Sequence, residues 1–220
     1  MATPLPSIQP VAALAGIDLA CRRGERLVFA GLSFALAAGG ALVLTGPNGS
    51  GKSSLLRLLA GLARPEAGVI AWQGASVADD PAAHRGRLHF VGHQDALKGV
   101  LTVGETLAFW AGMRGGGEIS AALAHFRLAA LADWPCRLLS AGQRRRLALA
   151  RLIASPARLW LLDEPTTGLD ADAVADLVAA LKGHRRDGGC VVLSTHTPVS
   201  LEGEETLRLE EFAARMPDDA

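Results

Sequence analysis

LTGPNGSGKSSLLRLLAGL, residues 44–62, joins the end of an apolar run to a glycine-rich loop and then to a leucine-rich segment with helical spacing. Gly46 to Ser53 match the pattern GxxxxGK[ST], and the flanks predict a strand before the loop and a helix after it. In α/β proteins such a loop carries a ligand at the carboxyl ends of parallel strands. The stretch therefore predicts an α/β fold with a ligand site at this loop.

The loop has the composition needed to bind phosphate. Glycines let the backbone turn its N–H groups inward, and the helix that begins near Lys52 adds the positive end of its dipole. We expect Lys52 to reach the β- and γ-phosphates of a nucleoside triphosphate and Ser53 to supply a hydroxyl ligand to Mg²⁺. The expected nucleotide contacts in the loop are Gly46, Pro47, Asn48, Gly49, Ser50, Gly51, Lys52, Ser53 and Ser54.

Composition excludes several classes of protein. Lysine plus arginine and aspartate plus glutamate both number 22, so no net charge favours binding to nucleic acid or to anionic lipid. Cys21, Cys136 and Cys190 are odd in number and show no CxxC spacing, which favours reduced cysteines. Residues 1–16 lack the basic start of a signal peptide. We expect a single cytoplasmic domain over residues 1–220.

An uncharged stretch from Leu27 to Gly51 has the composition of a membrane span. Gly39 and Gly40 signal a turn within it, however, and glycine and hydroxyl residues would have to lie in lipid. We predict two strands here, at 26–36 and 41–46, and no span.

Strands and helices alternate along the rest of the chain, which predicts a mainly parallel sheet. We expect further strands at 69–74, 87–92, 158–165, 190–196 and 205–210, and helices at 53–63 and 171–187. Between them, Thr102 and Glu105 form a capping box ahead of TLAFWAGM, and EISAALAHFRLAALA (118–132) reads as a further helix. We assign residues 95–154 as a helical subdomain inserted into the sheet domain.

Two acids follow the apolar run LWLL. Asp163 and Glu164 come at the end of this predicted strand, where the first can hold the hydration shell of Mg²⁺ and the second can orient or deprotonate an attacking water. Capping of the next helix is the alternative role for these acids, but the phosphate loop favours the metal and water roles.

A third motif is the pentapeptide Leu139-Ser140-Ala141-Gly142-Gln143, and with it the chain resembles the ATP-binding cassette (ABC) ATPases. In order, the resemblance comprises the phosphate loop, Gln94 after a strand, this signature, Asp163-Glu164, a Gly168-Leu169-Asp170 turn and His196 after a core strand. It spans nearly the whole chain. It implies a P-loop NTPase core with a mainly parallel sheet, an N-terminal antiparallel β subdomain and an α-helical subdomain.

The resemblance also implies how nucleotide is bound. ABC ATPases dimerise head to tail, so that ATP and Mg²⁺ lie between the phosphate loop of one chain and the signature of the other. Catalytic roles then fall on Glu164, His196 and Gln94, metal contacts on Ser53, Gln94 and Asp163, and contacts across the homodimer on Ser140, Gly142, Gln143 and Asp170.

Four positions depart from the family pattern. The chain contains no tyrosine, and Arg23 stands where many ABC ATPases stack an aromatic ring on adenine. A guanidinium also stacks on a purine face, so we expect Arg23 to contact the base with looser selection. Ala141, Gly40 and Thr197 replace a glycine, a glutamate and a frequent acid, and none of these changes removes a catalytic group.

Finer features resemble one branch of the family, the ATP-binding subunits of haem exporters in cytochrome c maturation. They lie at 71–74, 91–110, 139–152 and 194–199, and include the His93-Gln94 pair. The branch implies integral membrane transporter subunits of the cytochrome c maturation system as partners, and a peripheral position at the cytoplasmic face of the bacterial inner membrane. No histidine pair has the spacing of metal ligands, so no direct haem ligand is predicted in this chain.

Alternatives stay open at this point. One is the ATPase of another small ABC transporter, for lipoprotein, amino acid or metal, and another is a module that binds nucleotide without turnover. An ABC ATPase that acts on DNA or the ribosome is disfavoured by the neutral charge and the single cassette. We interpret the run Arg144-Arg145-Arg146 as a solvated or phosphate-near helix face, because three adjacent arginines on a helix point in different directions.

Overall fold

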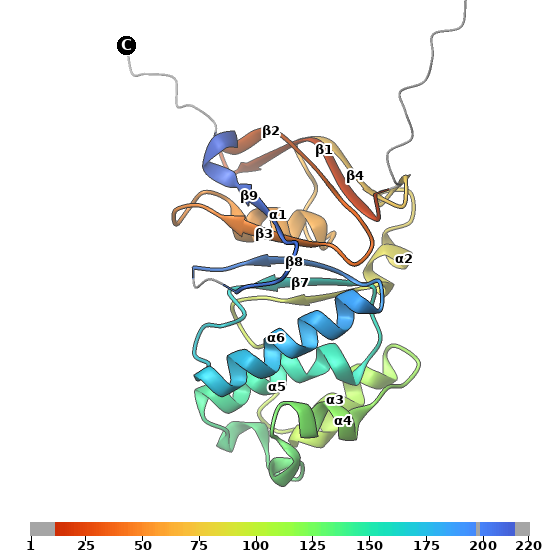
Figure 1. Ribbon diagram of the computed structural model, residues 1–220, viewed down its shortest axis with the longest axis vertical. Helices are drawn as coiled ribbons and strands as arrows, with labels where there is room; N and C mark the ends of the chain where they lie inside the picture. Colours follow the sequence, from red (N-terminus) through yellow and green to blue (C-terminus); the bar gives the residue numbers. More distant parts are fainter. Residues whose placement is uncertain (1–11, 197–198, 214–220) are drawn as a thin grey trace, which may run out of the picture.

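The computed structural model describes residues 12–196 and 199–213, and its elements are arranged in layers (Figure 1). An antiparallel sheet lies at one end, a parallel sheet lies in the middle, and a group of helices lies at the other end. Helix α1 (Lys52–Leu59) lies between the two sheets. This arrangement has the three parts that the resemblance implies: a mainly parallel sheet, an antiparallel β subdomain and an α-helical part.

Five strands form the parallel sheet in the described part of the chain. Their order is β6-β7-β8-β3-β9, and each neighbouring pair in it is parallel. The strands are β3 (Ala41–Thr45), β6 (Leu88–Val91), β7 (Leu159–Asp163), β8 (Cys190–Ser194) and β9 (Glu205–Arg208). β7 and β8 are interior strands and are buried at every residue, because other layers cover both faces of the sheet.

Two hydrophobic clusters pack against the two faces of the parallel sheet, and alternate residues of β7 divide between them. Leu159 and Leu161 belong to the cluster that contains α1, whereas Trp160 and Leu162 belong to the cluster on the other face. The helices of that second cluster include α5 (Ala141–Ala154) and α6 (Ala171–Arg186). The sheet is thereby held rigidly, and the carboxyl ends of its strands lie together at one edge.

The antiparallel sheet has the order β2-β1-β4-β5. Its strands are β1 (Leu14–Arg23), β2 (Arg26–Leu36), β4 (Ala67–Trp72) and β5 (Ala75–Ser76), and the short helix α2 (Pro81–Gly86) leads from it to β6. The hydrophobic faces of β1 and β2 pack in the same cluster as α1. The antiparallel sheet therefore supports the helix that follows the phosphate loop.

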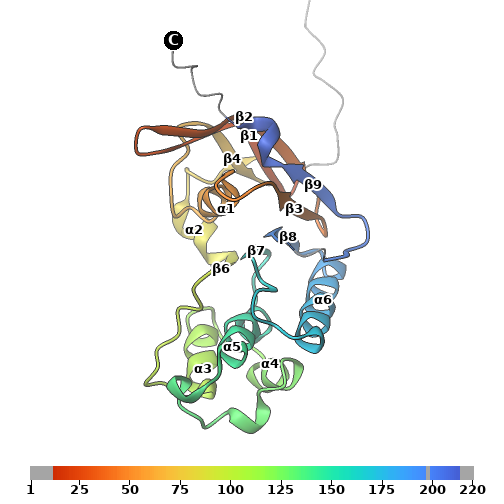
Figure 2. The ribbon, with the colours of Figure 1, turned by 90° about the vertical axis from the view of Figure 1, so that its left-hand side faces the viewer.

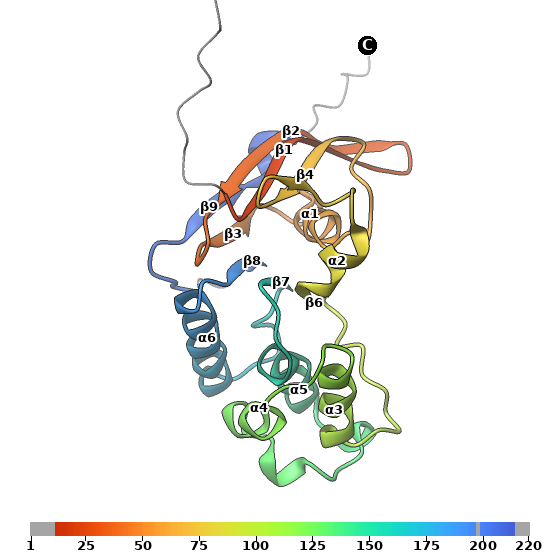
Figure 3. The ribbon, with the colours of Figure 1, turned by 90° about the vertical axis from the view of Figure 1, so that its right-hand side faces the viewer.

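Helices α3 (Val103–Gly112) and α4 (Ile119–His125) lie with α5 at the end opposite the antiparallel sheet (Figures 2 and 3). The predicted capping box is confirmed, because Thr102 Oγ1 accepts from the N–H of Glu105 and Glu105 Oε2 accepts from the N–H of Thr102. Two 3₁₀ turns, η1 (Ala129–Leu131) and η2 (Cys136–Leu138), connect α4 to α5. The boundaries of a helical subdomain at residues 95–154 stay a prediction.

Some elements differ from the sequence prediction. The helix predicted over 118–132 ends at His125, because Arg127 adopts a left-handed φ of 57° that a helix does not continue through. The final strand ends at Arg208, and a 3₁₀ turn, η3 (Leu209–Phe212), follows it. Residue patterns alone missed β1, β5 and α2. Within the described ranges, no helix is long and apolar enough to cross a membrane.

Two histidines, His89 buried and His184 half-buried, lie beneath the sheet on the side of α5 and α6. His89 of β6 is 2% exposed, and its Nε2 lies 3.0 Å from the carbonyl oxygen of Ser155. Burial lowers the pKa of His89 from 6.5 to about 3. His184 of α6 stacks on Trp160 with ring centroids 3.8 Å apart, and burial lowers its pKa to about 4. Both imidazoles are therefore neutral in the folded protein at pH 7.

We expect the free energy of unfolding to fall as the pH drops from about 6.5 toward 4. In that window the unfolded chain takes up protons at these imidazoles, and the folded chain does not. His89→Gln keeps a donor for Ser155 but does not titrate. Its free energy of unfolding should therefore decrease less than that of the parent as the pH falls, as measured by urea unfolding from pH 4 to 8. At pH 8, where neither histidine is protonated, the difference in free energy of unfolding between His89→Gln and the parent gives the packing cost alone. An unchanged slope in His89→Gln would contradict the assignment.

Candidate nucleotide-binding and hydrolysis site

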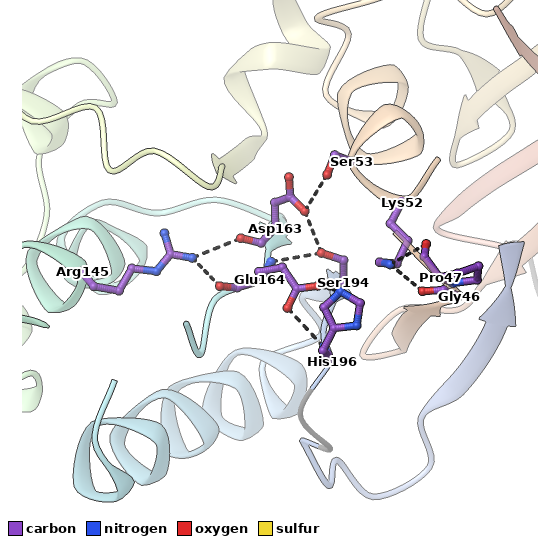
Figure 4. Close-up of polar contacts among 9 residues, drawn as sticks. All are labelled: Gly46, Pro47, Lys52, Ser53, Arg145, Asp163, Glu164, Ser194 and His196. Carbon is purple, nitrogen blue, oxygen red and sulfur yellow. Dashed lines mark hydrogen bonds and ion pairs between the residues drawn. The ribbon is translucent and has the colours of Figure 1, made fainter. Parts of the chain in front are cut away.

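The phosphate loop lies between the end of β3 and the start of α1, as predicted. Gly51 begins the helix with a left-handed φ of 106°, and a Cβ there would lie 2.8 Å from Val28 Cγ1 and 2.9 Å from Phe29 Cδ1. Only glycine fits this approach to β2. Lys52 is 8% exposed, and its Nζ donates to the carbonyl oxygens of Gly46 at 2.6 Å and Pro47 at 3.2 Å (Figure 4). The loop therefore wraps around its own lysine.

Asp163 ends β7 and joins two hydroxyl groups. Its Oδ1 accepts from Ser53 Oγ at 3.0 Å and from Ser194 Oγ at 2.7 Å (Figure 4). The carboxylate and the Ser53 hydroxyl are the hard oxygen donors that Mg²⁺ prefers. Among the described residues no group of three His, Cys, Asp or Glu side chains could hold a metal. A Mg²⁺ that keeps waters and contacts substrate phosphates fits this sparse donor set.

Glu164 follows in a turn with a left-handed φ of 49°. Its N–H donates to Ser194 Oγ at 3.0 Å and lies 3.2 Å from the Ser194 carbonyl oxygen. Its side chain is 17% exposed; Oε2 accepts from the N–H of His196 at 3.1 Å, and Oε1 lies 3.4 Å from His196 Nε2. The last residue of β8 thus fixes the backbone of Glu164, and His196 just after β8 fixes its carboxylate.

A cavity of about 890 Å³ brings these groups together. It is lined by much of the phosphate loop, by both acids and by His196. Arg23 also lines it, as the resemblance led us to expect, and so do Arg26 and His93, neither of which was among the predicted nucleotide contacts. Arg26 pairs with Arg23 across the β1–β2 turn.

Other predicted residues do not line this cavity. Gln94 is exposed after β6, with only its neighbour His93 at the cavity wall. Ser140 and Gln143 form a capping box at the start of α5, and Gly142 lies beside them. Asp170 caps α6 through the N–H of Ala173; that bond, together with Arg146, lowers the pKa of Asp170.

The arginine run and Thr197 were also singled out from the sequence. The solvated or phosphate-near interpretation of the arginine run is wrong for Arg145, which is 5% exposed and donates to backbone carbonyls near Glu164. Arg144 donates to the carbonyl of Leu139 and Arg146 to the carboxylate of Asp170. Thr197 lies outside the described residues.

Ser194 is a site residue that sequence reasoning missed. It ends the buried strand β8, beside Asp163 at the end of β7. A small hydroxyl residue at the carboxyl end of an apolar strand was the available signal. The burial of Arg145 could also have been predicted. It lies four and seven residues before Leu149 and Leu152 on α5, a spacing that places it on the same, buried face of the helix.

Comparisons with known proteins agree with this geometry. The sequence pattern of the ABC transporter family matches residues 15–167. A cytochrome c biogenesis ATP-binding export protein, CcmA, of Rhodospirillum rubrum is 59% identical over 204 residues, covering 92% of this chain and 88% of the relative. The protein of the same name from Paramagnetospirillum magneticum is 56% identical, covering 89% and 93%.

Solved structures share the fold. An ABC transporter ATP-binding protein from Pyrococcus furiosus superposes with a TM-score of 0.81 at 22% identity, over 91% of this chain and 99% of that one. An ATP-binding subunit of another ABC transporter gives a TM-score of 0.75 at 27% identity, over 84% and 79%.

We expect Arg23→Ala to weaken ATP binding about two- to fivefold, because an exposed guanidinium over a ring contributes about 0.5–1 kcal/mol. Calorimetric titration of ATP and GTP measures this loss and the base preference. Arg22→Ala is the matched control, since Arg22 carries the same charge, pairs with Glu66 and is not part of the cavity wall. Equal ATP affinities in Arg23→Ala and the parent would rule out a base contact.

Proposed function

The chain belongs to the ABC transporter family, and from this we propose that it is the ATP-hydrolysing subunit of an export complex that serves cytochrome c biogenesis. The observation that carries the chemistry is the placement of Glu164, held by His196, across one cavity from Lys52. The relatives named CcmA, at up to 59% identity, support the biological setting. We propose haem, or a protein that carries haem, as the substance that the complex handles.

Each group in the cavity has a defined task in hydrolysis. Lys52 and the loop amides bind the triphosphate. Ser53 and Asp163 would hold Mg²⁺, which would supply positive charge to neutralise the phosphates of the substrate. Glu164 orients or deprotonates the attacking water, and His196 positions its carboxylate through the two contacts described above. We keep Gln94 as the residue that would touch Mg²⁺ or the attacking water and relay the nucleotide state to the helical layer.

A second copy of the chain completes the site. Ser140, Gly142 and Gln143 lie at the N-terminus of α5, where helix N–H groups favour an anion, yet they are not part of their own chain's cavity wall. In a head-to-tail dimer they face the nucleotide held by the other copy, and Asp170 lies at the same interface. Nucleotide binding then joins the two copies, and hydrolysis separates them.

The helical layer offers a face for membrane subunits. Exposed apolar side chains on it form what we term the docking face: Val100, Phe109, Met113, Trp134 and Leu138. Backbone hydrogen bonds tie segment 99–104 to segment 132–138, for example from Cys136 to Leu101 and from Arg137 to Gly99. Phe109 and Met113 are four residues apart and share one side of a helix end. A contiguous apolar patch on a surface indicates a protein contact, and we propose that these residues form one.

We expect Glu164→Gln to lower ATP turnover about 10²–10⁴-fold and to trap an ATP-bound dimer, because the variant binds nucleotide without a base for the water. Phosphate release and light scattering with ATP measure both effects. Glu66→Gln, at an exposed acid paired with Arg22, is the control and should turn over normally. Absence of hydrolysis by the parent chain with its partners would rule out an enzyme.

We expect the tagged chain to recover cytochrome c maturation membrane subunits from detergent-solubilised membranes in the presence of ATP. Phe109→Ser with Met113→Ser should lower this recovery, since it removes apolar contact area from the docking face. Ile17→Ser with Val69→Ser, exposed on the antiparallel sheet, is the matched control. Recovery of a different permease would retain the ATPase and overturn the cytochrome c assignment.

A further inference from the structure

Three arginines attach the helical layer to the edge of the parallel sheet. β6 is an edge strand, so the carbonyls on its outer side have no strand partner in the described sheet. Along β6 and just after it, the carbonyls of Leu88, Phe90 and Gly92 accept hydrogen bonds from Arg114, Arg151 and Arg145 respectively. Arg114 follows α3, and the other two lie on α5. Guanidinium groups thus take the place of a partner strand and donate to the outward carbonyls of three alternate residues along this edge.

Arg145 differs from the other two because it also reaches the turn that carries Glu164. Its Nε donates to the Pro165 carbonyl at 3.2 Å, and its Nη2 donates to the carbonyls of Asp163 at 3.1 Å and Glu164 at 2.7 Å. Its Nη1 donates to Gly92 at 2.9 Å and to Asp95 Oδ1 at 3.1 Å. A guanidinium has five N–H donors, and these contacts use all of them.

The turn at Glu164 needs such a partner. A left-handed φ is uncommon for a residue with a side chain, and it turns three successive carbonyls, those of residues 163–165, toward one point. The planar fork of Arg145 donates to all three carbonyls, and Figure 4 shows the contacts to those of Asp163 and Glu164. On the opposite side of the turn, the Glu164 N–H is held by Ser194.

We propose that Arg145 is a positioning residue for ATP hydrolysis, one that fixes the backbone turn of Glu164 and ties it to segment 92–95, which carries Gln94. The inference rests on the proposed function. Because Arg145 lies in the first turns of the helix that begins with the signature, it joins three parts of the site in one hydrogen-bonded unit. A shift of α5 or of segment 92–95 then displaces the carboxylate that acts on water.

The charge and shape of arginine are both needed. Among the described residues Asp95 is its carboxylate partner, with a side chain 24% exposed, and the remaining four contacts are backbone carbonyls. Lysine offers three donors from a single nitrogen, so Arg145→Lys keeps the charge but loses the span from residue 92 to residue 165. Arg145→Gln loses both.

We expect kcat to fall about tenfold to a hundredfold in Arg145→Gln, and less in Arg145→Lys, with the KM for ATP changed less than about threefold. Hydrogen exchange at the amides of Glu164 and Thr167 should accelerate in the same order. Arg114→Gln is the matched control, because it frees carbonyls of the same edge without touching residues 163–165. Its kcat and the exchange at Glu164 should match those of the parent.

Unchanged kcat and unchanged exchange in both Arg145 variants would overturn the proposal, as would an equal loss of kcat in Arg114→Gln. If Arg145→Gln fails to fold, Arg145→Lys carries the comparison. Exchange at Glu164 is read without ATP turnover, so a chain that hydrolyses no ATP would overturn the proposed function while the exchange data still decide whether Arg145 fixes the turn.

Discussion

The hydrogen bonds at Asp163 are the interactions on which the site depends. One carboxylate oxygen joins Ser53 at the start of α1 to Ser194 at the end of β8, and Asp163 itself ends β7. Three elements far apart in sequence therefore meet at one atom. This is possible because β3, β7 and β8 run parallel, so that their carboxyl ends lie at the same edge. The buried apolar strands behind them keep that edge rigid.

Helix α5 links the chemistry to the helical layer. Its first residues carry the signature, its buried side chains pack in the cluster beneath the parallel sheet, and its arginines hold the edge strand and the Glu164 turn. Such a helix cannot move without changing several hydrogen bonds together. A helix bound at one end to the Glu164 turn and packed within the helical layer can carry a change between the two.

Much of the fold and the phosphate-binding half of the site could be predicted from sequence, since the loop at residues 46–53 is a contiguous pattern with one structural solution. Glu164 and His196 were selected only through the family order, and their contact comes from the structure, because no local pattern brings residues 32 positions apart together. Ser194 and Arg145 could not be assigned in the same way. Their roles depend on which strand lies beside which, and the residue pattern of a single strand or helix does not predict strand order.

The close approach of Gly51 to Val28 and Phe29 means that the phosphate loop is shaped from behind by a strand of the other sheet. The shape of the loop therefore depends on its packing against the antiparallel sheet. Phe29 lies 22 residues before Gly51 in the sequence, yet a substitution there would alter the backbone path of the loop. Grafting residues 44–62 onto another parallel sheet would transfer the motif without the surface that gives it its form.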